Sequence, residues 1–268
     1  MDNLKDVQNS TDNHIKIRID SVGVNNIKKP IFVATREGSF IHSVGVFELY
    51  SDLPHDVKGT HMSRLIVTLD KFQNERLTLD KLEEICDNIL NELEKATTAT
   101  VSCCFPYFMS KTTPVSRLNC LMDYDVNFQV SKIRYKTAKK KICVSVPVTS
   151  LCPCSKEISD AGAHNQRSIV TISAIVKNNA PILWIEELIE LAEKSASCEI
   201  YSVLKRVDEK YVTEKAYNNP VFCEDIVRNI ANDIYKSYYD KIEYFIIESS
   251  NMESIHNHNA YAMIQGAM

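Results

Sequence analysis

Two segments of this chain resemble each other, and that internal similarity constrains the fold more than any other feature of the sequence. Residues 59–68 (GTHMSRLIVT) match residues 162–171 (GAHNQRSIVT) at Gly, His, Arg, Ile, Val and Thr, with a constant offset of 103 residues. Similarity at a fixed spacing is typical of a chain built from repeated structural units. We therefore expect two modules of one plan, over residues 15–135 and 136–268.

The order of apolar patterns predicts the same α+β plan, ββααββ, in each module. Alternating apolar residues indicate half-buried strands, whereas apolar residues spaced three and four apart indicate helices. An antiparallel sheet with helices on one face satisfies this order. The expected strands are residues 15–19, 31–34, 43–49, 63–69, 99–105, 120–130, 141–148, 168–176, 241–248 and 259–264. The expected helices are residues 78–95, 182–196 and 219–239.

The composition argues against several functions. The net charge of −4 argues against broad binding to nucleic acid, because that affinity comes from many Lys and Arg contacts to phosphates. No apolar run approaches the roughly 18 residues that span a bilayer, so we expect no membrane association. Residues 1–14 are polar and lack an apolar signal sequence, so we interpret them as a disordered leader of a cytoplasmic protein. In that reducing compartment the nine cysteines are not expected to form disulfides.

A motif capable of binding metal occurs only in the second copy of the repeat. Leu-Cys-Pro-Cys at residues 151–154 precedes His164, whereas the first copy has Leu-Pro-His at residues 53–55. One thiolate, His164 and a carboxylate would leave the fourth tetrahedral position open for water. Since the rigid Pro153 directs the two thiols apart, we expect only one of them to be a ligand. A polar turn with two incidental thiols explains the spacing equally well.

Two further segments carry residues suited to substrate chemistry. Residues 205–214 are interpreted as a charged loop in which Lys205 and Arg206 would meet a phosphate, with a solvated loop as the alternative. His256 and His258 alternate, so on a strand edge both imidazoles would share one face. Paired histidines act as metal ligands or general acids, or they are simply exposed at the surface.

Short motifs extend this pattern over nearly the whole chain. They are DLPH (52–55) with KGTHMSR (58–64), PVTSLCPCSK (147–156), GAHNQR (162–167), LKR (204–206) with DEK (208–210) and VTE (212–214), NP (219–220) with ED (224–225), and HNHNA (256–260). With these motifs the chain resembles the type IB GTP cyclohydrolases, a metal-dependent family. The resemblance implies tandem tunnelling-fold modules that assemble into an oligomeric barrel, which agrees with the internal repeat.

The resemblance also implies a reaction and a metal site. The reaction opens the guanine imidazole ring of GTP with water, releases C8 as formate and gives 7,8-dihydroneopterin triphosphate, the entry to tetrahydrofolate synthesis. Cys152 and His164 resemble the family's metal ligands. Cys152 is also expected to be a catalytic residue. Glu209 resembles the third ligand, although Glu199 and Glu214 lie nearby in the sequence.

Substrate contacts and proton transfer complete the site that the resemblance implies. Glu224 resembles the glutamate that anchors the guanine edge, where a carboxylate accepts hydrogen bonds from the ring N–H and the exocyclic amine. Lys205 and Arg206 would hold the triphosphate. We expect metal-activated water to attack C8 while His256 or His258 moves protons to the ring nitrogens and the sugar.

The metal, the assembly and the exact activity stay open at this point. Thiolate and imidazole favour zinc, whereas a carboxylate with open positions admits manganese or iron. The resemblance implies a homo-oligomer, a tetramer, with its active site between modules or subunits. Cys154 has no assigned role, and His61 and Arg64 either line the pocket or brace the fold. The alternatives are another tunnelling-fold purine or pterin enzyme, such as a nitrile reductase, and a purine-binding module without turnover.

Overall fold

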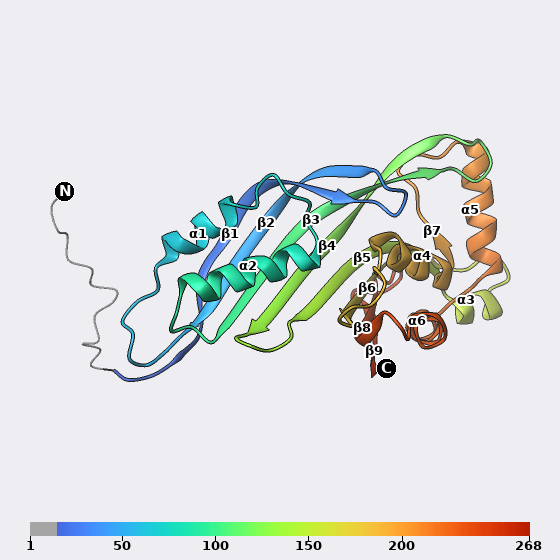
Figure 1. Ribbon diagram of the computed structural model, residues 1–268. Coiled ribbons are helices and arrows are strands. Elements are labelled where there is room, and N and C mark those ends of the chain that lie inside the picture. The colour runs from blue at the N-terminus through green and yellow to red at the C-terminus, as the bar shows by residue number, and fades with distance from the viewer. Residues whose placement is uncertain (1–14) are drawn as a thin grey trace. The chain divides into compact units, whose positions relative to one another are not determined.

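The computed structural model describes residues 15–268, so the leader expected over residues 1–14 lies outside the described part of the chain. The expected α+β class is confirmed, and most of the expected strands and helices are present, but residues 63–69 form a helix in place of the expected strand (Figure 1). The second half also contains α3, β7 and α5. The elements are β1 (Ile19–Ala34), β2 (Phe40–Leu53), α1 (Met62–Asp70), α2 (Leu79–Glu92), β3 (Thr98–Thr112), β4 (Asn119–Ile133), β5 (Lys139–Leu151), α3 (Pro153–Ile158), β6 (Asn165–Val176), α4 (Ile185–Ser195), β7 (Cys198–Glu199), α5 (Arg206–Asn218), α6 (Cys223–Ser237), β8 (Ile242–Asn251) and β9 (Ala260–Ala267).

The chain divides into two compact units, which are described separately. The first unit holds the described residues up to Ala34 together with residues 38–105 and 127–141. The second unit holds residues 35–37, 106–126 and 142–268, so β3, β4 and β5 contribute residues to both units. The module boundary expected between residues 135 and 136 stays a prediction.

In the first unit, antiparallel strands in the order β1-β2-β3-β4 carry the helices α1 and α2 (Figure 1). Leu82, Ile85 and Ile89 on α2 are almost completely buried, at the helical spacing that places them on one face. Leu49 on β2 and Val101 on β3 are buried with them. The Thr78 hydroxyl accepts a hydrogen bond from the Lys81 backbone N–H at 3.0 Å, which fixes where α2 begins.

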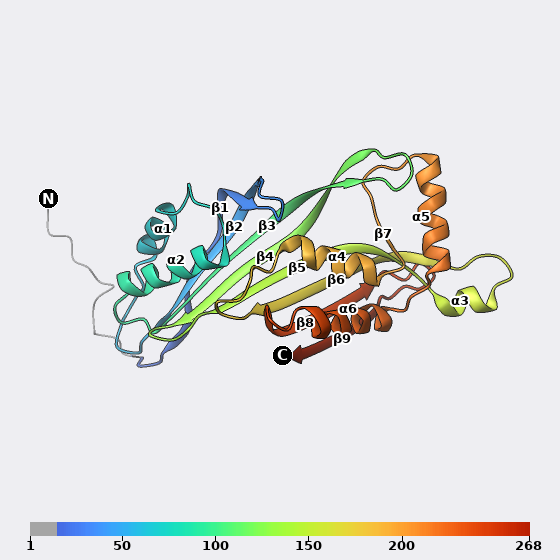
Figure 2. The ribbon, with the colours of Figure 1, turned by 45° about the vertical axis from the view of Figure 1, so that its right-hand side comes forward.

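In the second unit the strand order is β5-β6-β8-β9, with the short β7 paired to β5 (Figure 2). Burial alternates along β5, where Ile142, Val144, Val146 and Val148 are all buried. α6 packs against β8 and β9, and α4 packs against β6 and α6. An antiparallel sheet with helices against it is the α+β arrangement expected for this half.

The repeated motif forms different structures in its two copies. Residues 63–69, expected as a strand, belong to α1 instead, where Leu65, Thr68 and Leu69 are buried at helical spacing. The matching residues of the second copy lie in β6, where burial alternates. Since Leu, Ile, Val and Thr fit either period, the packing around each copy decides its structure. The repeat in sequence therefore does not mark equivalent positions in the two units.

The charged segment after β7 is a helix and not the expected loop. Residues 205–214 lie almost entirely in α5. Asp208 is buried and accepts a hydrogen bond from the Lys205 backbone N–H at 3.1 Å, which caps the first turn of the helix. Most of the other charged side chains remain exposed, so the sequence pattern resembled a loop.

Two strand expectations and the start of one helix also need correction. β1 begins at Ile19 and continues to Ala34 as one strand, whereas residues 15–18 are irregular. His256 and His258 lie in a turn segment between β8 and β9, and not on a strand edge. The helix expected from residue 219 begins at Cys223.

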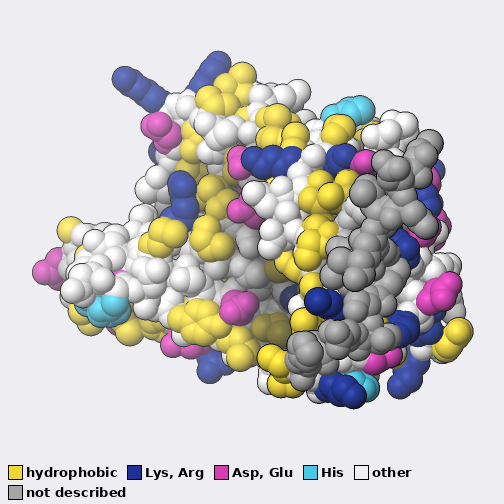
Figure 3. Space-filling view, turned by 90° about the vertical axis from the view of Figure 1, so that its left-hand side faces the viewer, with side chains coloured by type: hydrophobic (Ala, Val, Ile, Leu, Met, Phe, Trp, Pro, Cys, Tyr) yellow, Lys and Arg dark blue, Asp and Glu magenta, His cyan; other side chains and the backbone are white. Residues whose placement is uncertain are grey.

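The described surface mixes charges of both signs. On the face shown in Figure 3, Lys and Arg side chains alternate with Asp and Glu side chains, and hydrophobic groups lie between them. All nine cysteines are free thiols, and Cys86, Cys103, Cys120, Cys198 and Cys223 are buried. No helix within residues 15–268 is long and apolar enough to cross a membrane.

Candidate active site

A cavity of about 290 Å³ in the second unit brings together most of the residues that the sequence singled out. Its walls come from the end of β5, the start of β6, the start of α6 and the segment that joins β8 to β9. The expected site residues at this cavity are Cys152, His164, Glu224, His256 and His258.

Local backbone structure sets Cys152 beside His164. β5 ends at Leu151, and Cys152 is the N-cap of α3, with Pro153 in the first turn. The chain then reverses at Gly162, whose φ of 85° is favourable only for glycine. The Cys152 backbone N–H donates to the His164 carbonyl at 3.1 Å, so the two ends of the loop are joined.

A side-chain hydrogen bond determines which His164 nitrogen is available. His164 Nδ1 lies 3.0 Å from the Gln166 amide oxygen, which can only accept. Nδ1 therefore carries the proton, and the lone pair of Nε2 is left for a ligand. This arrangement is usual for a metal-binding histidine, because the second ring nitrogen donates to a neighbouring group and fixes the ring.

Glu253 is a cavity residue that the sequence reasoning missed. One of its carboxylate oxygens lies 3.8 Å from His164 Nδ1, and the other accepts from the Gln166 amide at 3.4 Å. Both Glu253 and His164 are largely buried. The available signal was position, because Glu253 lies only three residues before His256 in the same turn segment.

A buried polar network lies beneath the cavity. Asn251 donates to the Ser150 hydroxyl at 3.0 Å, and Ser150 donates to the Val221 carbonyl at 3.0 Å. On its other side, the Asn251 amide oxygen accepts from the hydroxyls of Ser168 and Ser249. The network therefore links β5, β6 and β8 to the segment that leads into α6. Ser249 and Asn251 continue the buried face of β8. Polar residues at positions where the strand is otherwise apolar were the sequence signal that could have predicted this network.

Glu224 lies in the first turn of α6 with its carboxylate beside a thiol. Cys223 Sγ donates to Glu224 Oε2 at 3.2 Å. Burial and this contact raise the pKa of Cys223 to about 12, so the group remains a thiol donor. Hydrogen bonds from its own backbone N–H and from that thiol hold the pKa of Glu224 below its ordinary value. The cavity thus presents an ionised carboxylate.

The two histidines of the turn segment lie against each other. The rings of His256 and His258 stack with centroids 5.0 Å apart and planes 14° apart. Both side chains are exposed, so protons can exchange with solvent from this side of the cavity. A turn, and not strand alternation, places them together.

Three of the expected site residues do not line this cavity. Glu209, Lys205 and Arg206 are exposed at the start of α5. The other carboxylates considered as third ligand are paired elsewhere, since Glu199 bonds to Lys215 and Glu214 bonds to Lys210. Cys154 is exposed on α3, and His61 and Arg64 line a different cavity in the first unit.

The donor atoms of the cavity fit part of a metal site. Cys152 supplies a thiol and His164 supplies Nε2, which are ligands that zinc and similar ions accept. Within residues 15–268, no group of three or more His, Cys, Asp or Glu side chains is arranged to hold an ion.

The fold is shared with a solved enzyme of low sequence similarity. Urate oxidase from Bacillus subtilis 168 matches 92% of this chain and 98% of its own, with a TM-score of 0.54 and 10% identity. At that identity the likeness concerns the α+β fold alone.

The family follows from the sequence comparisons. The family model described as type I GTP cyclohydrolase folE2 matches residues 4–262. GTP cyclohydrolase FolE2 of Nitrosomonas eutropha is 48% identical over 98% of this chain and 95% of its own length. The FolE2 protein of Methylobacillus flagellatus is 46% identical over the same shares. The chain belongs to the type I GTP cyclohydrolase FolE2 family and is a GTP cyclohydrolase of folate biosynthesis.

Proposed function

We propose that this chain works by the type IB mechanism in the cavity of its second unit, converting GTP and water to formate and 7,8-dihydroneopterin triphosphate in the cytoplasm. The observation that carries the proposal is the convergence of Cys152, His164, Glu224, His256 and His258 on one cavity. These residues come from separate elements, and a thiol, imidazoles and a carboxylate are the groups that this chemistry requires.

Glu224 orients the base. An ionised carboxylate at the start of α6 accepts hydrogen bonds from the guanine ring N–H and exocyclic amine, and the Cys223 thiol fixes one of its oxygens at 3.2 Å. The Asn251 network holds the segment before α6, because Ser150 bonds to the Val221 carbonyl. The base edge therefore meets a carboxylate with a defined position.

Cys152 and His164 would hold a divalent ion, zinc, manganese or iron. When bound, such an ion supplies a Lewis acid that lowers the pKa of water near guanine C8. Gln166 and Glu253 keep the His164 ring oriented, with Nδ1 protonated. The stacked His256 and His258 carry protons between solvent and the ring nitrogens as the imidazole ring of the base opens.

The third ligand and the triphosphate contacts would come from a second copy of the chain. Glu209, Lys205 and Arg206 are exposed on α5 and absent from the cavity of their own chain. An exposed carboxylate beside two cations can complete the cavity of another subunit. A homotetramer of the barrel type, as the family resemblance implies, would provide this contact.

The test of this function is turnover of GTP by the purified chain. With added Zn²⁺, Mn²⁺ or Fe²⁺, we expect one formate per GTP and a product that becomes a fluorescent pterin after oxidation and dephosphorylation. The matched control is Glu224→Gln, which keeps the side-chain size but loses the charge that binds the base. Absence of formate with each of the three ions would refute the proposal.

A further inference from the structure

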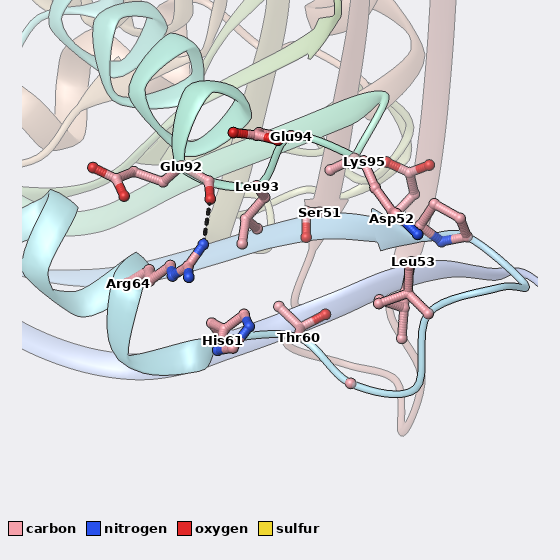
Figure 4. A pocket seen from close by; sticks show the side chains of 14 residues that line it. Ser51, Asp52, Leu53, Thr60, His61, Arg64, Glu92, Leu93, Glu94 and Lys95 are labelled. Carbon is pink, nitrogen blue, oxygen red and sulfur yellow. Dashed lines mark hydrogen bonds between the residues drawn. The ribbon is translucent and has the colours of Figure 1, made fainter. Parts of the chain in front are cut away.

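A second cavity, of about 310 Å³, lies entirely within the first unit. It is bounded by the end of β2, the start of α1 and the turn after α2 (Figure 4). Ser51, Thr60, His61 and Arg64 face this space. The cavity is as large as the one in the second unit, and the proposed reaction assigns it no role.

The start of α1 brings the positive end of a helix to this cavity. This helix has nine residues, His61 provides no side-chain cap, and the first turn contains no acidic residue. A helix N-terminus that has neither a side-chain cap nor an acidic residue in its first turn leaves the positive end of the helix dipole uncompensated. Arg64, in the same turn, donates one of its five N–H groups to the Glu92 carbonyl at 2.7 Å and is otherwise exposed.

Ser51 is a buried hydroxyl that points into the cavity. Ser51 is 2% exposed, and its Oγ has no hydrogen-bond partner within the described chain. The side chain extends from β2 towards Thr60 (Figure 4). A buried hydroxyl without a partner is costly and rare, so it indicates a group that is supplied from outside the protein.

The acidic side chains around this cavity are already engaged or directed elsewhere. Asp52 is held by Arg18 at 3.0 Å and by the backbone N–H groups of Thr97 and Thr98, both at 2.7 Å. These hydrogen bonds outweigh the effect of burial and hold the pKa of Asp52 below its ordinary value.

The C-terminal end of α2, which also borders the cavity, has its negative carbonyl groups covered. Arg134 donates to the carbonyls of Leu90 and Leu93, and the carboxylates of Glu92 and Glu94 extend away from Ser51 (Figure 4). Arg134 therefore neutralises part of the negative end of α2.

We propose that this cavity binds a phosphate group, through Arg64, the start of α1 and the Ser51 hydroxyl. Arginine, helix N-termini and hydroxyl groups are the donors that phosphates prefer. The phosphate belongs either to a separate small ligand or to the triphosphate of GTP held by another copy of the chain. Both sources share one chemistry, and the test separates them.

The experiment measures binding of inorganic tripolyphosphate to the full chain by calorimetry, without turnover. We expect Arg64→Gln to weaken binding about tenfold or more, since it removes a charge-assisted contact. Arg76→Gln is the control, because it makes the same charge change outside this cavity. Ser51→Ala is expected to weaken binding severalfold while leaving the melting temperature of the free protein unchanged or higher, because it removes a buried hydroxyl without a partner.

The second arm repeats the titration with saturating GTP. If GTP displaces tripolyphosphate and Arg64→Gln raises KM for GTP, the phosphate is that of the substrate. If both titrations give the same affinity and KM is unchanged, the ligand is a separate one. Parental affinity in both Arg64→Gln and Ser51→Ala overturns the site, and so does a Ser51→Ala protein that melts lower but binds as the parent does. Because binding is read without formate release, failure of this site is distinguishable from failure of the proposed reaction.

Discussion

Three hydroxyl groups surround the Asn251 side chain at the cavity of the second unit, those of Ser150, Ser168 and Ser249. All four residues are at least 98% buried, so a lost partner cannot be replaced by bulk water. We predict that Asn251→Ala lowers the free energy of unfolding by about 2–3 kcal/mol, because it leaves buried hydroxyls with fewer partners. Denaturant unfolding measures this change.

The control for that substitution is Ser250→Ala, the neighbouring position on β8, whose side chain lies partly exposed. It should change the free energy of unfolding by less than about 0.5 kcal/mol. Equal effects of the two substitutions would show that the network does not stabilise the cavity floor.

At the residue scale, short motifs pointed to several side chains that line one cavity, whereas their chemical roles stay predictions. Cys152, His164 and the pair His256 and His258 all line this cavity. Glu253 and Asn251 were missed because their role depends on burial and on contacts between strands distant in sequence. Glu209 differs, because its motif predicts a metal ligand whereas its side chain is exposed on α5 and does not line the cavity.

At the element scale, Asp208 connects α5 to the turn between β3 and β4. Its carboxylate accepts from the backbone N–H groups of Val115 and Ser116 at 2.9 and 2.8 Å, and from the Ser116 hydroxyl. Burial alone would raise the pKa of Asp208, but hydrogen bonds from Ser116, Val115 and Lys205 hold it well below the ordinary value.

We predict that Asp208→Asn destabilises the protein at neutral pH and that the difference from the parent narrows in acid. A carboxylate with a depressed pKa stabilises the fold above its unfolded pKa of about 3.9 and loses that contribution as the pH falls through the folded value. Unfolding curves of both proteins between pH 7 and pH 3 measure this. A difference that stays constant below about pH 4 would contradict the assignment.

The same element scale explains the error in the repeated motif. Gly-x-His-x-x-Arg is followed by Leu-Ile-Val-Thr in the first copy (65–68) and by Ser-Ile-Val-Thr in the second (168–171). The first stretch lies in helix α1, whereas the second lies in strand β6. Gly162 has a positive φ that starts the turn into β6, whereas Gly59 is not among the glycines with that conformation. Nearly identical sequences therefore adopt different secondary structures, because packing against the rest of each unit determines which one forms.

At the scale of the whole molecule, the α+β class was predictable, because strand and helix periods are regular along most of this chain. The order of elements was predictable only in part, since α1 and α5 were expected as a strand and a loop. The compact units were less predictable, since β3, β4 and β5 contribute to both of them. The amino-acid composition of a strand does not reveal that it is shared between two compact units.

The proposed assembly predicts complementation between inactive copies. Cys152→Ala and Glu209→Gln chains should each be inactive alone, whereas co-expressed chains should recover up to about a quarter of parental activity if Glu209 completes the cavity of another subunit. Formate release per cavity measures the recovery. Activity no higher than the sum of the two variants would place Glu209 on its own chain or outside the site.

The most direct measurement compares Cys152→Ala with Cys154→Ala, in bound metal and in formate released from GTP. The two thiols lie two residues apart, but only Cys152 lines the cavity beside His164. We predict that Cys152→Ala loses its metal and at least about 100-fold in kcat/KM, while Cys154→Ala keeps both within about threefold. Parental metal content and turnover in Cys152→Ala would contradict the central claim that this cavity is the catalytic site.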